Sequence, residues 1–306
     1  MSRTARSVTD ILSAADNACY LAKEHGRNRV HVCSSSDLEL ARRRQEAHWL
    51  TRINKALEED LFSLVLHPVI RLNRQSSTDE GTDQESFEMH LRMHDEQGGE
   101  VPATVFLSAA ERYHIAAELD RWALQHTLRW LGEDAERLRA LKYCCIDLTA
   151  ASLRDDDFVD CAVVMLNESG VAAGKICFGL PEAMLLDGNS ASSRFIDCMR
   201  KLGAHFAVNG FGTGQATVRT IGQLPVDSLK LHADIVNDVV GNPVARALAK
   251  NLVEIARITG KQSVAPEVES KAVLEVLRDI GVEFAVGPAI GIPRAIESPR
   301  KRVRLA

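Results

Sequence analysis

The sequence predicts an α/β protein built around a (β/α)8 barrel. From Leu61 onward, about eight apolar, strand-like runs alternate with amphipathic, helix-like segments, which is the pattern of a parallel sheet covered by helices. Several helix-like segments end in glycine, the residue preferred just after a helix. A doubly wound open sheet has the same alternation and remains the alternative.

The predicted elements follow one another with short connections. Strand-like runs occupy 61–72, 86–93, 143–149, 175–181, 205–211, 228–231, 262–268 and 284–290. Helix-like segments occupy 102–113, 118–131, 158–170, 191–203, 245–260 and 270–281. The polar stretch 71–86 predicts a loop between the first two strands. In a barrel, functional residues are expected at the C-terminal ends of the strands.

The two ends of the chain have different patterns. Residues 34–48 begin with a serine-rich cap signal and continue with helical spacing, which predicts a helical linker that joins a domain at 49–297. Residues 1–33 contain the pattern of one helix and one short strand, too little to fold alone. The basic run 298–306 predicts a solvated tail.

Composition excludes several classes of protein. The net charge of −5 is unlike that of a nucleic-acid-binding surface, which needs clustered Lys and Arg. No apolar run reaches the roughly 18 to 20 residues that a membrane span needs, and the first residues lack the apolar core of a signal peptide. The 7 cysteines contain no CxxC pair. We therefore expect a cytoplasmic protein without a membrane span, a nucleic-acid partner or a cofactor.

A set of short motifs identifies a family. The segments FEMHLRM, IDLT, GLPEAML, VNGFGTGQATVRTIGQLPVDSLKL, APEVES and AVGPAIGIP follow one another with the order and spacing of EAL domains, over about residues 45–296. This resemblance implies a TIM-like barrel related to the phosphodiesterases that linearise cyclic di-GMP. The segment AADNACYLAKEHGRNRV resembles the end of a GGDEF domain. We therefore interpret residues 1–33 as a GGDEF remnant that lacks the cyclase signature.

At most of the positions that hold metal in active EAL enzymes, the resemblance indicates replacement. Gly179 stands for a ligand glutamate, Asn209 and Gly210 for a pair of aspartates, Pro266 for a further glutamate and Val286 for a glutamine. A two-metal hydrolytic site needs several converging carboxylates, and Gly or Pro supplies no side-chain oxygen. We therefore expect a degenerate EAL domain without phosphodiesterase activity and without metal. His90 or His232 could rescue a single transition-metal site only with partners.

Other family positions keep their chemistry. By resemblance, Glu88 remains a ligand position and Asp147 replaces an asparagine there, while Glu182 and Glu269 support the site from behind. The residues expected to bind nucleotide are Glu88, Arg92, Asp120, Asp147 and Lys230. From the residues alone, Arg92 could equally form a salt bridge on the rim, and Asp120 could be a residue that starts a helix.

These observations leave three functions open. The first is a catalytically inactive, metal-independent cyclic di-GMP receptor. The second is a protein-interaction scaffold that no longer binds nucleotide, and the third is residual phosphodiesterase activity. A protein partner and a homodimer are expectations that rest on the resemblance.

Overall fold

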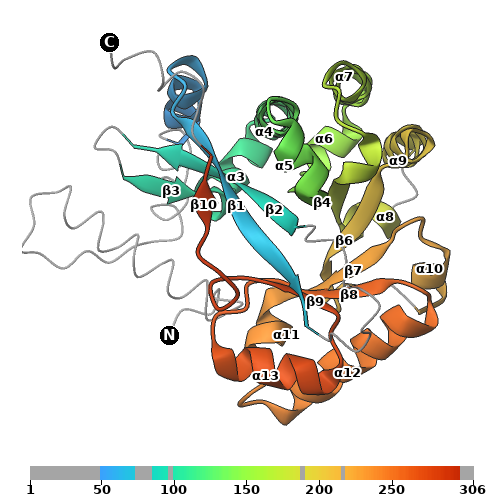
Figure 1. The fold of residues 1–306 in the computed structure, drawn as a ribbon. Coiled ribbons are helices and arrows are strands. Elements are labelled where there is room, and N and C mark those ends of the chain that lie inside the picture. The colour runs from blue at the N-terminus through green and yellow to red at the C-terminus, as the bar shows by residue number, and fades with distance from the viewer. Residues whose placement is uncertain (1–48, 73–84, 96–98, 187–189, 215–217, 297–306) are drawn as a thin grey trace, which may run out of the picture.

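The computed structural model describes residues 49–72, 85–95, 99–186, 190–214 and 218–296, and within them it forms a closed barrel (Figure 1). Around the barrel the strands follow the order β1, β2, β4, β5, β6, β7, β8 and β9, and β1 pairs with both β2 and β9. This closure confirms the barrel and excludes the open sheet. The predicted remnant 1–33, linker 34–48 and tail 298–306 lie outside the described residues and stay predictions.

All eight predicted strands form, and two short ones are added at the edges. The strands are β1 (Phe62–Arg71), β2 (Glu85–His94), β3 (Glu100–Pro102), β4 (Leu141–Asp147), β5 (Ile176–Pro181), β6 (His205–Phe211), β7 (Ser228–Leu231), β8 (Gln262–Ala265), β9 (Phe284–Val286) and β10 (Arg294–Ala295). The strands from β4 to β9 pair in parallel with their neighbours, and β2 is parallel to β4. β1 is antiparallel to β2 and β9.

The direction of β1 departs from the ideal alternating pattern. Consecutive antiparallel strands need no helical crossover, whereas parallel ones do. The sequence between the first two strands carries no helical periodicity, and this was the signal for an antiparallel pair.

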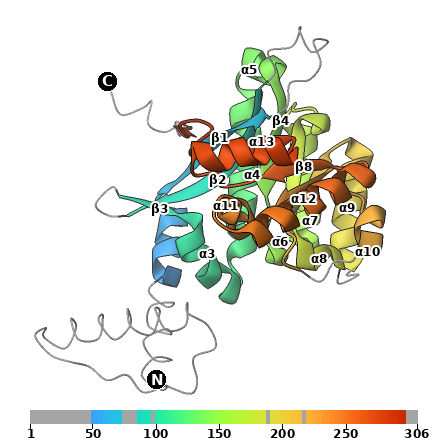
Figure 2. The same ribbon diagram turned by 90° about the horizontal axis from the view of Figure 1, so that it is seen from below.

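Helices surround the strands from α4 round to α13 (Figures 1 and 2). They are α3 (Ala103–Arg112), α4 (Ala116–Gly132), α5 (Ala135–Ala140), α6 (Ala150–Arg154), α7 (Asp156–Glu168), α8 (Glu182–Leu186), α9 (Ser190–Leu202), α10 (Val218–Gln223), α11 (Ala233–Asp238), α12 (Pro243–Ile258) and α13 (Lys271–Ile280), with a further helical stretch at 49–58. Within the described ranges, none of these helices has both the length and the apolar character of a membrane span.

Local sequence sets the ends of the longer helices. The Asn242 side chain accepts hydrogen bonds from the backbone N–H groups of Val244 and Ala245, and Pro243 occupies the first position of α12. The Ser270 side chain caps α13 in the same way, and Gly281 ends it in the left-handed conformation. The helix therefore ends where the sequence pattern predicted.

The alternation of side chains along each strand produces two layers. Outward residues of β4, β5 and β6, among them Ile146, Phe178 and Phe206, pack against the helices in the main core. Inward residues Cys145, Cys177 and Ala207 form a small cluster inside the barrel. A second core packs the 49–58 helix against α3 and the start of α4. The functional residues lie in the polar layer next to the inner cluster.

Candidate functional site

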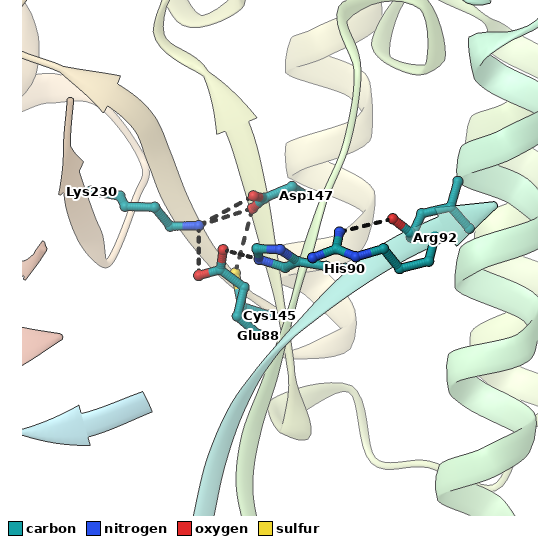
Figure 3. A network of polar contacts seen from close by, with 7 residues as sticks. Glu88, His90, Arg92, Cys145, Asp147 and Lys230 are labelled. Carbon is teal, nitrogen blue, oxygen red and sulfur yellow. Dashed lines mark hydrogen bonds and ion pairs between the residues drawn. The ribbon is translucent and has the colours of Figure 1, made fainter. Parts of the chain in front are cut away.

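The centre of the site is the ammonium group of Lys230, which lies between two carboxylates from different strands (Figure 3). Lys230 Nζ is 3.0 Å from Glu88 Oε2, and 3.1 and 3.3 Å from Asp147 Oδ1 and Oδ2. The side chains of Lys230 and Glu88 are each 6% exposed, and that of Asp147 is 41% exposed. β2, β4 and β7 thus bring together three of the five residues predicted to bind nucleotide.

The opposite charges of the cluster keep both Glu88 and Lys230 ionised. Burial acts to raise the pKa of Glu88, but the Lys230 ammonium and the hydrogen bond from His90 outweigh it and hold that pKa well below its usual range. Burial acts to lower the pKa of Lys230, but Asp147 and Glu88 hold it well above its usual range. Lys230 is therefore a buried, compensated cation, and its charge does not face outward as a free phosphate ligand would require.

Two histidines extend the polar layer toward β1. His90 Nε2 is 2.7 Å from Glu88 Oε1, and the His90 ring stacks on His67 with ring centroids 4.2 Å apart. Burial, followed by the charges of His90 and Arg92, lowers the pKa of His67 to about 4. The sequence patterns did not single out His67. Its place in the first strand, directly opposite Glu88 in the β1–β2 register, was the signal available.

Gly179 gives Asp147 the space that it occupies. A Cβ atom at residue 179 would lie 1.9 Å from Asp147 Oδ1 and 2.8 Å from Asn209 Nδ2, far inside van der Waals contact. Asp147 and Asn209 therefore fill the volume where a side chain at 179 would begin. Three of the positions flagged by the sequence are thus packed against one another.

The glycine-rich turn after β6 has a packing role. Gly212 has a φ of +109°, and a Cβ there would lie 2.5 Å from Leu252 Cδ1 of α12. A Cβ at Gly214 would lie 2.3 Å from Glu182 Oε1, so that carboxylate rests against the turn. The supporting role expected of Glu182 in the site stays a prediction. Gly210 lies beside His232, whose ring accepts the backbone N–H of Asp234 at the start of α11.

The Asp120 carboxylate accepts hydrogen bonds from two residues that follow β4, Thr149 and the α6 residue Ser152. Its Oδ2 accepts hydrogen bonds from Thr149 N at 2.7 Å, Thr149 Oγ1 at 2.8 Å and Ser152 Oγ at 2.6 Å. Burial raises the pKa of Asp120 to about 6, against the effect of these donors. The residue lies inside α4, beyond its first turn. Its carboxylate holds the segment that directly follows Asp147 at the end of β4, and the sequence patterns did not identify Thr149 or Ser152.

Arg92 is a second cation of the site, and its guanidinium is not paired with an acid in the described ranges. Its Nη1 donates to the carbonyl of Leu91 at 3.3 Å, and among the described residues this is the one hydrogen bond of the guanidinium (Figure 3). The salt bridge considered for Arg92 is not formed with any acid in the described ranges. Arg92 is partly buried and follows Glu88 and His90 along the same face of β2.

The remaining positions predicted from the family resemblance are Pro266 and Glu269, which follow β8, and Val286, which ends β9. Pro266 and Val286 are buried, and Glu269 is exposed. Glu267, next to Pro266, has a φ of +50°, which is strained for a residue with a side chain. Neither Pro266 nor Val286 has a side-chain atom that binds metal.

The resemblance implies two divalent ions, and this donor set does not fit them. Gly179, Gly210, Pro266 and Val286 have no side-chain oxygen, and the oxygens of Glu88 and Asp147 already contact an ammonium group. Among the residues that the structure describes, no three His, Cys, Asp or Glu side chains are arranged to hold a metal ion. Hard divalent cations need several oxygens at about 2.0 to 2.6 Å.

Comparison with known proteins places this chain in a family. The family model described as EAL domain matches residues 50–293. The chain is similar to the cyclic di-GMP phosphodiesterase PdeB of Shewanella oneidensis, with 28% identity over 290 residues, which cover 94% of this chain and 33% of that protein. It is also similar to the cyclic di-GMP phosphodiesterase PdeR of Escherichia coli, with 28% identity over 263 residues, covering 86% and 38%. The chain thus spans only about a third of the length of these relatives.

Solved structures of EAL domains have a similar fold. The FimX EAL domain from Pseudomonas aeruginosa bound to c-di-GMP aligns with a TM-score of 0.69 and 25% identity, over 80% of this chain and 96% of that one. The PaMucR phosphodiesterase in complex with c-di-GMP aligns with a TM-score of 0.72 over 84% of this chain and 100% of that one, and at 20% identity it bears on the fold alone. The barrel, its motifs and the family match together show that this chain belongs to the EAL domain family.

Proposed function

We propose that this chain is a catalytically inactive EAL domain that binds cyclic di-GMP without metal and acts as a receptor in cyclic di-GMP signalling. The observation that carries the proposal is the donor set, because Gly179, Gly210 and Pro266 supply no side-chain oxygen where the family resemblance places metal ligands. A two-metal site needs several converging carboxylates, and of the family's ligand positions Glu88 and Asp147 alone have one here. We therefore expect nucleotide binding that needs no added ion.

Arg92 is the residue proposed to meet a phosphate. Its guanidinium is not held by a carboxylate in the described ranges, and a guanidinium can donate two parallel hydrogen bonds to a phosphate. The turn at 212–214 adds backbone N–H groups at the end of β6. Lys230 was expected to contact the phosphate directly. In the proposal it instead offsets part of the negative charge of Glu88 and Asp147, which would repel an anion.

Calorimetric titration with cyclic di-GMP tests this function. We expect saturable binding of equal affinity in EDTA and in Mg²⁺, and no linear product after long incubation with Mg²⁺ or Mn²⁺. Arg92→Ala should weaken binding about tenfold to a hundredfold, the value of a hydrogen bond to a charged group. Arg257→Ala, an exposed arginine of α12 paired with Glu254, is the matched control and should bind normally. Folded protein that gives no heat at high ligand concentration would refute the receptor, and formation of the linear product would refute inactivity.

One surface favours the second candidate, a protein-interaction scaffold. Val240, Val244 and Leu248 follow one another at intervals of four residues along α12 and the turn before it, and they are 48%, 73% and 37% exposed. Val244 and Leu248 lie one helical turn apart, and a group of exposed apolar side chains is typical of a protein-binding face, for a second copy or another protein. Val244→Lys should abolish self-association in sedimentation measurements if a homodimer uses this surface. An unchanged mass would exclude that interface.

A further inference from the structure

We propose that Cys145 and Cys177 form a dithiol site inside the barrel, where a low-molecular-weight disulfide oxidises the two thiols to one reversible cross-link between β4 and β5. The two cysteines belong to the inner cluster, and Cys145 lies directly below the carboxylate of Asp147. This modification goes beyond the proposed function and does not use Arg92. It is tested without nucleotide, so its failure leaves the receptor standing.

The two cysteines lie side by side on neighbouring strands. Cys145 of β4 and Cys177 of β5 are direct partners in the parallel register, and both belong to the inner cluster with Ala207. Neighbouring strands lie about 4.7 to 4.9 Å apart, and a disulfide joins Cα atoms about 4.4 to 6.8 Å apart. Both side chains point toward the axis of a closed barrel, so we expect their Cβ atoms to converge. The backbone therefore allows the cross-link with little movement of either strand.

The direction of the side chains makes this pair selective. Cys144, next to Cys145 in β4, packs in the main core on the other face of the sheet. Cys161 and Cys198 lie in α7 and α9, outside the barrel. Among the cysteines in the described ranges, Cys145 and Cys177 are the two in the inner cluster. Each is therefore the nearest partner available to the other.

The two thiols contact each other, and one of them contacts the polar layer of the site. A hydrogen bond with Cys177, followed by burial, holds the pKa of Cys145 well above its usual range, whereas the ammonium group of Lys230 acts to lower it. Cys145 Sγ also donates to Asp147 Oδ1 at 3.8 Å (Figure 3). The Asp147 side chain is 41% exposed, so the layer directly above Cys145 is open to solvent. A small oxidant reaches the pair on this side, and it reacts slowly because the Cys145 thiol is protonated.

The oxidation consists of two thiol–disulfide exchanges. The thiolate of one cysteine attacks the external disulfide, forms a mixed disulfide and releases one small thiolate. The thiolate of the second cysteine attacks the protein sulfur of that mixed disulfide and releases the other small thiolate. The two protons lost by the cysteines go to the released thiolates, so the pair loses two electrons and the external disulfide becomes two thiols. The second exchange is fast, because the two protein sulfurs are held together.

The cross-link changes the contacts of Asp147. Oxidation removes the S–H group of Cys145 and with it the hydrogen bond to Asp147 Oδ1, an oxygen that also contacts Lys230. Excess small thiol reverses both exchanges and restores the donor. The redox state of the pair is therefore coupled to the polar layer of the site.

Peptide mapping of the folded chain tests this site. The whole chain is incubated with hydroxyethyl disulfide, a small neutral disulfide, and the remaining thiols are then alkylated in denaturant. Digestion with trypsin places Cys145 in the peptide 143–154 and Cys177 in the peptide 176–194. We expect mass spectrometry to find these two peptides linked in most chains, and dithiothreitol to separate them.

Cys144 provides the matched control, because it lies in the same peptide as Cys145 and is buried on the opposite face of β4. Cys144→Ala should keep the link between the two peptides, and Cys145→Ala should abolish it. The parent chain unfolded in urea is a second control that needs no variant, and relative to other cysteine pairs it should form this link at least about tenfold less often. A folded parent in which the two peptides stay separate would overturn the site. A link that persists in Cys145→Ala, or one as frequent in the unfolded chain, would do the same.

Discussion

Asp120 is expected to make the stability of the barrel depend on pH in the opposite sense to an ordinary ion-paired carboxylate. Its pKa is raised by burial from 3.8 to about 6 in the folded protein. A raised pKa in the folded state means that the folded protein binds the proton more tightly than the unfolded chain. The resulting stabilisation is fully present below pH 3.8 and is lost as the pH rises through 6.

The magnitude follows from the shift. The shift from 3.8 to about 6 corresponds to about 3 kcal/mol at the acid limit, and about 1.4 kcal/mol of it is lost between about pH 5 and pH 8. Asp120→Asn keeps an oxygen acceptor for Thr149 and Ser152 but cannot titrate. The difference in unfolding free energy should therefore shift in favour of the variant by that amount from pH 5 to pH 8.

Urea unfolding of both proteins at several pH values measures this difference. Comparison with the Asn variant cancels the other titrating groups, because they are common to both chains. Asp120→Ala serves as the control for lost hydrogen bonds, and it should be destabilised at every pH by about 1 to 3 kcal/mol, since its donors lose a partner. A difference between Asp120→Asn and the parent that does not change with pH would refute the reasoning.

Gly212 and Glu267 both have a positive φ, and substitutions at the two positions should change stability in opposite directions. Gly212→Ala should destabilise the fold by about 2 to 4 kcal/mol, because the residue has a positive φ and its Cβ would meet Leu252; a stable variant in urea unfolding would contradict this. Glu267→Gly should raise the unfolding free energy by up to about 1 kcal/mol by relieving a φ of +50°, and a lower midpoint in thermal unfolding would count against that strain.

Periodicity predicted most of the fold. The run from Tyr143 to Thr149 and the runs parallel to it are apolar, or alternate between apolar and polar residues, as strands of a helix-covered sheet do. The structure has β4 over most of this run, up to Asp147. The direction of β1 was harder to predict, because hydrophobic pattern fixes which face a residue takes but not which way a strand runs. That direction had to be inferred from the connection, and the polar stretch before Glu85 was interpreted only as a loop.

The sequence predicted which residues lie at the site, but not which of them contact one another. Motif spacing placed Glu88, Asp147 and Lys230 on one rim, and the structure joins them in one ion cluster. Spacing could not show that Lys230 faces inward to its partners, because the partners lie on strands far apart in sequence. The role of Asp120 was missed for the same reason, since its donors Thr149 and Ser152 lie 29 and 32 residues away.

Under the proposed function, the residues at 147 and 179 are not independent replacements. By the family resemblance, Gly179 stands for a ligand glutamate and Asp147 for an asparagine, at positions far apart in the sequence. Together they form a packed unit, because the carboxylate of Asp147 occupies the volume above Gly179 and is held there by Lys230. Lys230 offsets one of the two negative charges of Glu88 and Asp147 without an added ion. A side chain at 179 should therefore require a change at 147 as well, since the cost of the first substitution depends on the residue at the second position.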